Sequence, residues 1–332
     1  MNLISVDEER EKKFMNLSEK LLEYFSENKE FISGEELAKR YDVSRNAVWK
    51  AVKQLKASGY DIISDKSGYM LGVNNTRPLL CELKRKIGFD NIILLDLAES
   101  TNEYAKTLAV NGAEEKTAVF ALEQSKGKGR MGRSFVSNKG GLYFSVILRP
   151  RLSANETMLI TVAAAVAVCE TLNSAAKKDF LIKWVNDIYL SDKKVCGILT
   201  EGAFNAETGS LDYAVLGIGI NLSPVADKLP DGLKQTVGSV FENENISSEI
   251  YSDIAADIYN RFFKYYSDIE KRSFMEFYKS HSYLDGKTVS FSKEGKPHTA
   301  VVLGITDNAG IILKEGNSET VLNAGEVSVK PI

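Results

Sequence analysis

The sequence contains only two histidines, His281 and His298, and both lie near its C-terminal end. This scarcity argues against histidine acid–base chemistry and against a histidine-rich metal site. The three cysteines, Cys81, Cys169 and Cys196, are far apart, and their spacing is typical of neither a metal site nor a disulfide framework. Such cysteine usage fits a reducing cytoplasm. The chemistry of this chain therefore has to rely on lysine, arginine, carboxylates and backbone groups.

Long hydrophobic segments and a strong net charge are also missing. The charged N-terminal segment lacks the apolar core of a signal peptide. The uncharged runs at residues 157–169 and 213–226 are shorter than the roughly 20 residues that span a bilayer, and we expect both in a buried core. The formal net charge is −3, so any contact with nucleic acid requires a local basic face. We therefore expect a cytoplasmic protein without a membrane partner.

The N-terminal part has the pattern of a winged helix-turn-helix. Residues 16–27 carry apolar side chains at helical spacing, and Ser33 with Glu36 forms a capping-box pattern at the start of a second helix. Ser44 then caps a third helix, which has an apolar face and an opposite, basic face. Residues 60–71 have the pattern of a hairpin, which would form the wing.

We predict that the helix-turn-helix at residues 33–52 binds DNA. Between residues 44 and 60 there are four basic residues and no acidic one. A solvated basic face on a small helical domain would show the same charges, but the agreement of cap, turn, wing and charge favours DNA binding. The contacting side chains would be Ser44, Arg45, Asn46, Trp49, Lys50 and Lys53.

The remainder of the chain has a different pattern of secondary-structure signals. Beyond a segment at residues 74–78 that looks like a linker, strand-like and helical runs alternate, as in a mixed α/β domain. From about residue 284 the pattern changes to short strands and turns, which indicates a small β-barrel. These strands are expected at residues 288–292, 299–305, 310–314, 320–323 and 327–330. The sequence thus predicts an α+β multidomain protein with domains at residues 1–75, 76–283 and 284–332.

The densest chemical signal is the segment SKGKGRMGR at residues 125–133, which holds four cations, three glycines and no acid. Glycine lets backbone N–H groups turn toward an anion, and the cations would neutralise phosphate charge. The residue order excludes a Walker loop, and the cations between the glycines do not suit a Rossmann loop. Taken alone, the segment fits a phosphate cradle and a mobile basic surface loop equally well.

A second signal follows the strand-like run at residues 91–96. Ser100 and Glu103 form another capping-box pattern. A helix that begins here would present free N–H groups and hydroxyls at the end of the sheet, where a polar ligand can bind. A helix that is simply well capped would show the same residues.

A third signal comes from neighbouring strands. Residues 180–190 are predicted to form one strand, interrupted after Val185, that carries Lys183, and Lys194 lies on the next strand. In the run LGIGINL, Gly217 and Gly219 leave one strand face without side chains, which makes room for a flat ligand or another backbone. One such lysine is usually a surface residue, whereas two beside a glycine strand favour a ligand site.

Taken in order, these motifs resemble those of the bifunctional biotin–protein ligase and biotin-operon repressor family, and the match covers essentially the whole chain. No single motif is specific, but the ordered set is. The resemblance implies a class II synthetase-like catalytic domain between a winged helix-turn-helix and an SH3-like β-barrel. The matching motifs are STN at residues 100–102, GKGRMGR at 127–133, KWVND at 183–187, KVCGIL at 194–199 and GIGIN at 217–221.

The resemblance also implies a reaction. Biotin and Mg-ATP would form biotinyl-5′-AMP and pyrophosphate, and a lysine of biotin carboxyl carrier protein would then take the biotinyl group. Lys194, Arg130 and Lys183 would be catalytic. Lys183, Asn186, Asp187 and Asn221 would serve the nucleotide or its Mg²⁺, without a dedicated metal site. Biotin or biotinyl-AMP would be bound by Ser100, Thr101, Asn102, Gln124, Lys128, Gly129, Arg130, Lys194, Gly217 and Gly219.

Regulation is implied in the same way. Biotinyl-AMP would order the segment at residues 125–133 and promote a homodimer through an exposed sheet edge around residues 141–149 and 199–204, which would place two winged helices on operator DNA. In this arrangement Lys128 and Arg130 would be the cations that contact the ligand, and Arg133 would lie at the periphery.

The chain departs from the family pattern at Lys128, Val185 and Phe135, which stand where arginine, proline and tryptophan are common. None of these changes removes a required charge, so activity is still expected. Two alternative functions stay open. The first is a transcription factor that only senses biotin, and the second is a lipoate or octanoyl ligase, which shares the catalytic fold.

Overall fold

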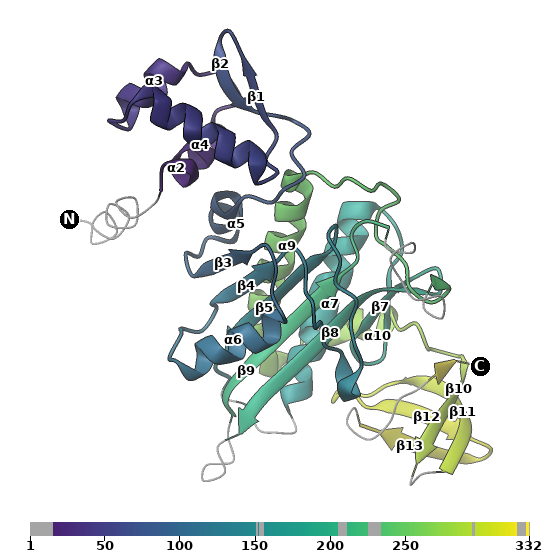
Figure 1. The fold of residues 1–332 in the computed structure, drawn as a ribbon. Coiled ribbons are helices and arrows are strands. Elements are labelled where there is room, and N and C mark those ends of the chain that lie inside the picture. The colour runs from purple at the N-terminus through teal and green to yellow at the C-terminus, as the bar shows by residue number, and fades with distance from the viewer. Residues whose placement is uncertain are drawn as a thin grey trace. The chain divides into compact units, whose positions relative to one another are not determined.

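The computed structural model describes residues 16–150, 152, 156–204, 211–224, 234–293, 296–323 and 330–331. Contacts between Cα atoms divide the chain into two compact units (Figure 1). The first unit ends at Gly88 and also includes Asn245–Asp253, and the second contains Phe89–Glu244 and the chain from Ile254 onward. The three predicted domains, with boundaries after residues 75 and 283, stay a prediction.

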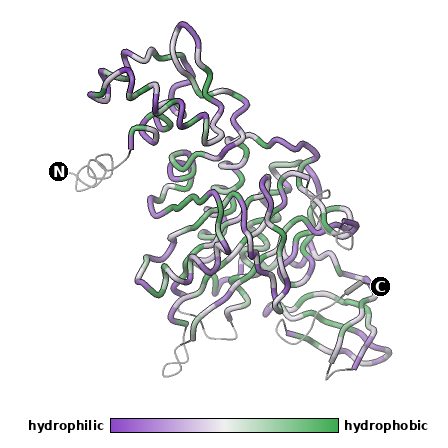
Figure 2. Tube along the Cα trace, viewed as in Figure 1, coloured by the Kyte–Doolittle hydropathy of each residue, from purple (hydrophilic) through white to green (hydrophobic). Residues whose placement is uncertain are grey.

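The first unit contains the predicted helices and wing. Asn16 and Ser33 each form a reciprocal capping box with the glutamate three residues later, and the Ser44 side chain accepts from the Ala47 N–H. The hairpin tip, at residues 65–68, is hydrophilic (Figure 2). The elements are α2 (Leu17–Glu27), α3 (Gly34–Arg40), α4 (Arg45–Ala57), β1 (Ile62–Asp65), β2 (Gly68–Leu71) and α5 (Leu80–Ile87).

One hydrophobic cluster holds this unit together. Leu21 of α2, Leu37 of α3 and Val48 of α4 are fully buried in it. Burial of each such side chain contributes about 1.5–3 kcal/mol, so the apolar faces fix the angle between the helices. As a consequence the opposite face of α4, which carries Trp49 and Lys53, stays exposed.

The second unit is built on a seven-stranded sheet with the order β3-β4-β5-β9-β8-β7-β6. Only the pair β3–β4 is parallel. The predicted single strand at residues 180–190 is wrong, because the chain reverses there and forms the hairpin β6–β7. The strands are β3 (Ile92–Leu95), β4 (Ala118–Ala121), β5 (Leu142–Leu148), β6 (Leu181–Lys183), β7 (Asp187–Leu190), β8 (Lys193–Phe204) and β9 (Leu211–Ile220).

Helices cover both faces of this sheet (Figure 1). On one face, α6 (Thr101–Val110) packs through Ala105 and Ala109 on Val119, Ile147 and Val215. On the other face lies α7 (Thr157–Ala176). The face that α6 covers also carries the residues of the site.

The helix α7 is apolar almost all round. Its Thr161 hydroxyl contacts that of Thr200 on β8, and its Thr171 hydroxyl donates to Asp257 of α9 (Ser248–Tyr266). Among the described residues, α7 alone is long and apolar enough to cross a membrane by length and composition, and 72% of its most apolar window is buried in the protein. The predicted buried core at residues 157–169 is thus confirmed.

The C-terminal part forms a five-stranded antiparallel sheet with the order β13-β12-β11-β10-β14. Closure of this sheet into an SH3-like barrel stays a prediction, and most of the strand predicted at residues 327–330 lies outside the described residues. Before the sheet come two short elements, η4 (Ile269–Lys271) and α10 (Met275–Ser280). The strands are β10 (Thr288–Lys293), β11 (Lys296–Ile305), β12 (Ile311–Glu315), β13 (Ser318–Leu322) and β14 (Lys330–Pro331).

Candidate active site

A cavity of about 330 Å³ opens in the second unit, on the face of the sheet that α6 covers. This volume suits a small organic ligand. Every residue that the sequence assigned to substrate, nucleotide or magnesium lines the cavity, so residues up to 121 positions apart along the chain come together. They are Ser100, Thr101, Asn102, Gln124, Lys128, Gly129, Arg130, Lys183, Asn186, Asp187, Lys194, Gly217, Gly219 and Asn221.

One end of the cavity is polar and carries no formal charge. The Gln124 Oε1 atom accepts from the backbone N–H of Thr101 at 2.8 Å and lies 3.1 Å from the Thr101 hydroxyl. Its Nε2 atom donates to Ser137 at 2.9 Å. Because a backbone N–H can only donate, these contacts fix the Gln124 amide with its oxygen toward α6.

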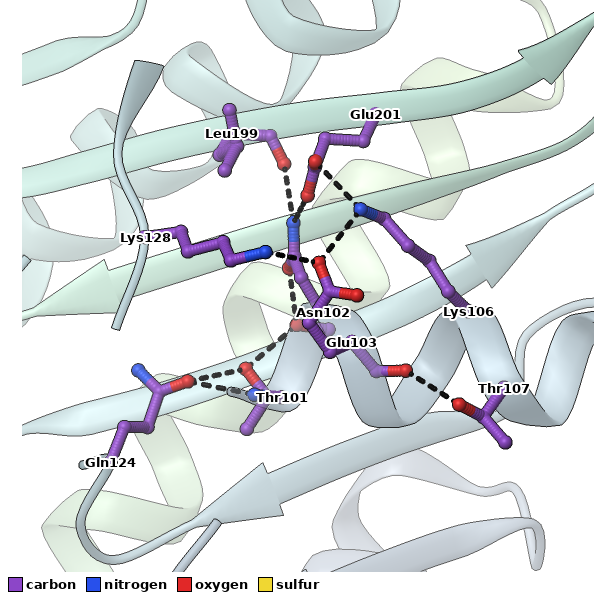
Figure 3. Close-up of polar contacts among 10 residues, drawn as sticks. Thr101, Asn102, Glu103, Lys106, Thr107, Gln124, Lys128, Leu199 and Glu201 are labelled. Carbon is purple, nitrogen blue, oxygen red and sulfur yellow. Dashed lines mark hydrogen bonds and ion pairs between the residues drawn. The ribbon is translucent and has the colours of Figure 1, made fainter. Parts of the chain in front are cut away.

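The capping box predicted for Ser100 and Glu103 is not formed. Ser100 is the N-cap residue of α6, but its side chain makes no capping hydrogen bond. The first N–H of the helix is bound by Gln124 instead. The carboxylate of Glu103 contacts Lys106 and Lys128, so it serves the basic loop rather than the helix end (Figure 3).

Asn102 lies between α6 and the sheet. Its Oδ1 atom accepts from the buried hydroxyl of Ser145 at 2.6 Å, and its Nδ2 atom donates to Glu201 at 2.8 Å. A Cβ atom at Gly217 would lie only 2.0 Å from Asn102 Oδ1. Gly217 therefore makes room for the Asn102 side chain.

The basic loop at residues 125–133 forms a narrow turn beside this polar end. The Gly129 N–H donates to Arg133 O, the Phe135 N–H donates to Gly127 O, and η1 (Arg130–Gly132) forms the tip. The Lys128 ammonium lies 2.7 Å from Glu103 Oε1. The predicted change of this loop from disorder to order stays a prediction.

Arg130 extends from the loop toward the β6–β7 turn, where its guanidinium donates to Asn186 Oδ1 at 3.1 Å. Burial lowers the pKa of Arg130, while the nearby Asp187 opposes that shift. An arginine remains charged under any such shift, so a partly desolvated cation faces the cavity. Such a cation attracts an anion more strongly than one in bulk water does.

Two lysines on strands complete the cationic end. The Lys194 ammonium forms an ion pair with Asp187 at 2.7 Å. The Lys183 ammonium lies 3.3 Å from the Tyr189 hydroxyl and 5.1 Å from the centre of its ring. Burial, with a smaller contribution from Asp187, raises the pKa of Tyr189 to about 12, so Tyr189 is a neutral phenol at physiological pH.

The binding of a flat ligand against the glycines stays a prediction, and in this structure an aromatic ring lies at that position. A Cβ atom at Gly219 would lie 2.8 Å from the Phe135 ring, and one at Gly197 would lie 3.1 Å from it. The ring of Phe135, which follows the basic loop by two residues, therefore occupies the space above both glycines. The Lys194 ammonium lies 5.9 Å from the centre of that ring, so a ligand at this position would have to share the space with Phe135 or displace it.

Sequence reasoning missed several residues of this region. Tyr189 and Phe135 line the cavity, while Ser145, Lys106 and Glu201 orient residues that line it. Phe135 was considered only as a departure from the family pattern. A signal did exist for the other buried groups, because a serine in the apolar run LYFSVIL and a glutamate in the strand after KVCGIL need polar partners.

In the first unit, the residues predicted to contact DNA lie at the start of α4 and on its exposed face. Trp49 is 50% exposed, and the Lys53 ammonium lies 5.2 Å from the centre of its ring. Arg45 lies 3.8 Å from Glu35, with both side chains largely exposed. Ser44 uses its hydroxyl oxygen to cap the helix, and its contact with DNA stays a prediction.

The sheet edge predicted for dimerisation is partly wrong. β5, which contains most of residues 141–149, is an inner strand between β4 and β9, and all its side chains are buried. β8 differs along its length. β7 pairs with it only between Lys193 and Gly197, and among the described residues no strand pairs with the same side of β8 beyond that point.

Comparisons with known proteins agree with this arrangement. The model of the Biotin/lipoate A/B protein ligase family matches residues 94–221, and a model of an HTH domain matches residues 18–70. The bifunctional ligase/repressor BirA of Bacillus spizizenii is 38% identical over 231 residues, which cover 68% of this chain and 70% of that protein. The BirA of Escherichia coli K12 is 30% identical over 202 residues, 59% of this chain and 61% of its own length.

Solved structures show the same similarity. A biotin protein ligase from Aquifex aeolicus in complex with biotin and ATP has a TM-score of 0.60 and 28% identity, and the match covers 74% of this chain and all of that one. A second structure of that ligase, a variant in complex with biotin, has a TM-score of 0.61 and 26% identity, with 73% and 99% covered.

Proposed function

Because this chain belongs to the family of bifunctional biotin ligases and repressors, we propose that it forms biotinyl-5′-AMP from biotin and ATP, transfers biotin to a lysine of biotin carboxyl carrier protein, and represses transcription in response to biotin. The observation that carries this proposal is that the residues lining one cavity form two groups by their contacts, a neutral polar group around Thr101 and a cationic group with Arg130 and Lys194. A biotin molecule has the same division, with a neutral ureido ring at one end and a carboxylate at the other.

The neutral end suits the ureido ring. Thr101, Gln124 and Asn102 line it with hydroxyl and amide groups, and such groups can both donate to a carbonyl and accept from ring N–H groups. Gln124 uses its oxygen to bind α6 and one amide N–H to bind Ser137, so its second amide N–H is the group that remains for a ligand. A neutral end of this kind fixes the orientation of biotin and places the carboxylate toward the lysines.

The cationic end suits the reaction of two anions. The biotin carboxylate oxygen attacks the α-phosphorus of ATP, the bond from that phosphorus to the bridging oxygen breaks, and pyrophosphate leaves. This step needs no nucleophilic side chain. It needs the two anions to be held together and the charge on the α-phosphate to be stabilised. Lys194 and Arg130 would hold the carboxylate and the α-phosphate, and Lys128 would screen the charge between them.

The same cations would assist the second step. The amine of the carrier lysine attacks the acyl carbon of biotinyl-AMP, the amine loses a proton, and AMP leaves with the electrons of the broken acyl–oxygen bond. Lys194 and Arg130 would stabilise the negative charge that stays on the phosphate of AMP. Lys183, which Tyr189 orients, would hold the nucleotide.

The residues on the β7 side of the cavity fit a magnesium ion that arrives with ATP. Among the described residues no cluster of three or more histidine, cysteine or carboxylate groups can hold a metal, so phosphate oxygens would have to supply most ligands, as is usual for Mg²⁺. Asn221 Oδ1 is buried and has no hydrogen-bond partner within the described chain. It and the Asp187 carboxylate would orient the bound nucleotide, and the ion would supply further charge neutralisation at the phosphates.

Repression would use the winged helix-turn-helix of the first unit. The exposed basic face of α4 would contact operator DNA, with Arg45, Lys50 and Lys53 as the charged contacts. Binding of biotinyl-AMP would favour a homodimer, and the half of β8 beyond Gly197 would supply its edge, where antiparallel pairing of two copies would continue the sheet. A dimer would place two such helices on one operator.

The proposal is tested by incubation of the purified chain with biotin, Mg²⁺ and ATP. We expect release of pyrophosphate that depends on biotin, followed by labelling of a carrier protein. Biotin binding without pyrophosphate release would indicate a sensor instead of an enzyme. Lipoate should not compete, and release driven by lipoate in place of biotin would assign the chain to the lipoate branch of the same ligase family.

A further inference from the structure

A series of polar contacts connects the neutral end of the cavity with the half of β8 beyond Gly197 (Figure 3). Asn102 Nδ2 donates to Glu201 Oε2 at 2.8 Å, and the other oxygen of Glu201 accepts from the Lys106 ammonium at 2.7 Å. Lys106 also contacts Glu103 at 3.0 Å, and Glu103 in turn holds Lys128 of the basic loop. Two lysines and two glutamates thus form a balanced group beside the site.

The orientation of the Asn102 amide depends on this group. An amide can rotate so that its oxygen and nitrogen exchange places, and the two orientations present different hydrogen-bonding atoms to a ligand. Ser145 can donate to either Asn102 or Thr101, because its hydroxyl oxygen lies 2.6 Å from Asn102 Oδ1 and 2.8 Å from Thr101 Oγ1. Ser145 alone therefore does not select one orientation.

Glu201 does select one, and the Leu199 carbonyl, 3.5 Å from Asn102 Nδ2, favours the same orientation through a longer contact. An ionised carboxylate only accepts hydrogen bonds, so it requires the nitrogen of Asn102 to face it. Lys106 keeps the carboxylate in place, since it binds the second oxygen. Although partial burial opposes the shift, the hydrogen bonds of Lys106 to Glu201 and then to Glu103 raise its pKa, so this cation is charged whenever the site is active.

We propose that Glu201, held by Lys106, is a positioning residue for biotin recognition: it fixes the Asn102 amide in the orientation that the ureido ring of biotin requires. This inference rests on the proposed function. Glu201 is absent from the lining of the cavity, whereas Asn102 lines it, so the effect of Glu201 passes through the Asn102 amide to which it is bonded. The side chains of Lys106 and Glu201 are 26% and 29% exposed, so the test has to measure Tm beside biotin affinity.

The test is the substitution Glu201→Gln, which preserves shape and removes the charge. The oxygen of the new amide would bind the charged Lys106, and its nitrogen would then face the nitrogen of Asn102. We expect Asn102 to lose its preferred orientation, and the KM and Kd for biotin to rise about tenfold, as for one lost hydrogen bond. The KM for ATP and the kcat should change less than about twofold, because the cationic end keeps all its residues.

The matched control is Glu170→Gln. Glu170 also accepts from a cation and a second donor, Arg261 and Tyr265, and its side chain is 20% exposed, but it lies on α7, on the opposite face of the sheet. We expect biotin affinity to be unchanged in this control. A selective rise in the KM for biotin in Glu201→Gln alone supports positioning, whereas an unchanged KM, or equal rises for biotin and ATP with a lower Tm, would overturn it.

A second variant keeps the inference testable if Glu201→Gln does not fold. Lys106→Met removes the cation that holds Glu201 and leaves Asn102 untouched. We expect a smaller but equally selective loss of biotin affinity, and an unchanged affinity would overturn the inference. The wild-type chain separates the two levels of the argument: if it binds no biotin in calorimetry, the proposed function itself fails, whatever the variants do.

Discussion

The contact between Gly217 and Asn102 leads to a prediction about a single methyl group. In Gly217→Ala the new Cβ atom would lie 2.0 Å from Asn102 Oδ1, 2.8 Å from Cγ and 3.0 Å from Nδ2. Atoms in a folded protein do not approach that closely, so the side chain of Asn102 has to move. It cannot move freely, because its amide oxygen is bonded to Ser145 and its amide nitrogen to Glu201.

The magnitude follows from the two hydrogen bonds that the movement breaks. The bond from the Ser145 hydroxyl is between neutral groups and contributes about 0.5–1.5 kcal/mol, while the bond to the Glu201 carboxylate is charge-assisted and contributes about 1.5–3 kcal/mol. If both are lost, at least about 2 kcal/mol disappears from the site. Part of this free energy is lost from folding stability and part from ligand affinity. If about 2 kcal/mol is lost from binding, the affinity for biotin decreases about 30-fold.

The assay is calorimetric titration with biotin, together with thermal unfolding of the ligand-free protein. Gly202→Ala is the control, because Gly202 lies on the neighbouring strand and a Cβ there would meet mainly the end of the flexible Leu211 side chain, at 2.5 Å. We expect weaker biotin binding in Gly217→Ala and unchanged binding in Gly202→Ala. Biotin affinity equal to wild type in Gly217→Ala, with no loss of Tm, would refute the reasoning that Asn102 is held rigidly.

Three further predictions follow from the charges. For Lys194→Ala we expect loss of biotin-dependent pyrophosphate release, and unchanged turnover would contradict its assigned role. For Arg45→Ala we expect weaker operator binding in a gel shift with ligation intact, and a salt dependence reduced by about one phosphate contact. Hydrogen bonds from Lys128 and then Lys106 lower the pKa of Glu103. The ionised Glu103 therefore stabilises the fold fully above its ordinary pKa, and this stabilisation disappears as pH falls through the lowered pKa. When pH falls from about 6 to about 3, we expect the Tm of Glu103→Gln to decrease less than the Tm of the wild type.

The helices of the first unit were predictable because their signals are local. The capping boxes at Asn16 and Ser33 and the cap at Ser44 each act within three residues of the chain, and the apolar stripes repeat within one helix. The strand predicted at residues 180–190 failed for the opposite reason. The alternation of polar and apolar side chains continues through a tight hairpin, so it cannot distinguish one long strand from two short paired ones.

The composition of the site was predictable, but its internal contacts were not. Lysines, glycines and amides in ordered motifs indicated which residues meet, and all of them line one cavity. The partners of those residues depend on the register of the sheet. Gly217 faces Asn102 and Gly219 faces Phe135 because α6 and the basic loop lie on the same face of β9, a relationship between segments that no local pattern contains.

This register also changes how the basic loop has to be understood. The sequence predicts that the four cations within residues 125–133 repel one another until an anion binds. In the structure three cations that line the cavity already have partners: Lys128 binds Glu103, Lys194 binds Asp187, and Arg130 binds Asn186. An incoming carboxylate or phosphate therefore exchanges one anionic or polar partner for another, so the net gain from each contact is smaller than a bare cation would give. Selectivity then has to come from geometry, because only a ligand that bridges several of these cations at once recovers the exchanged interactions. Under the proposed function, biotinyl-AMP would be such a ligand, since it would span both ends of the cavity.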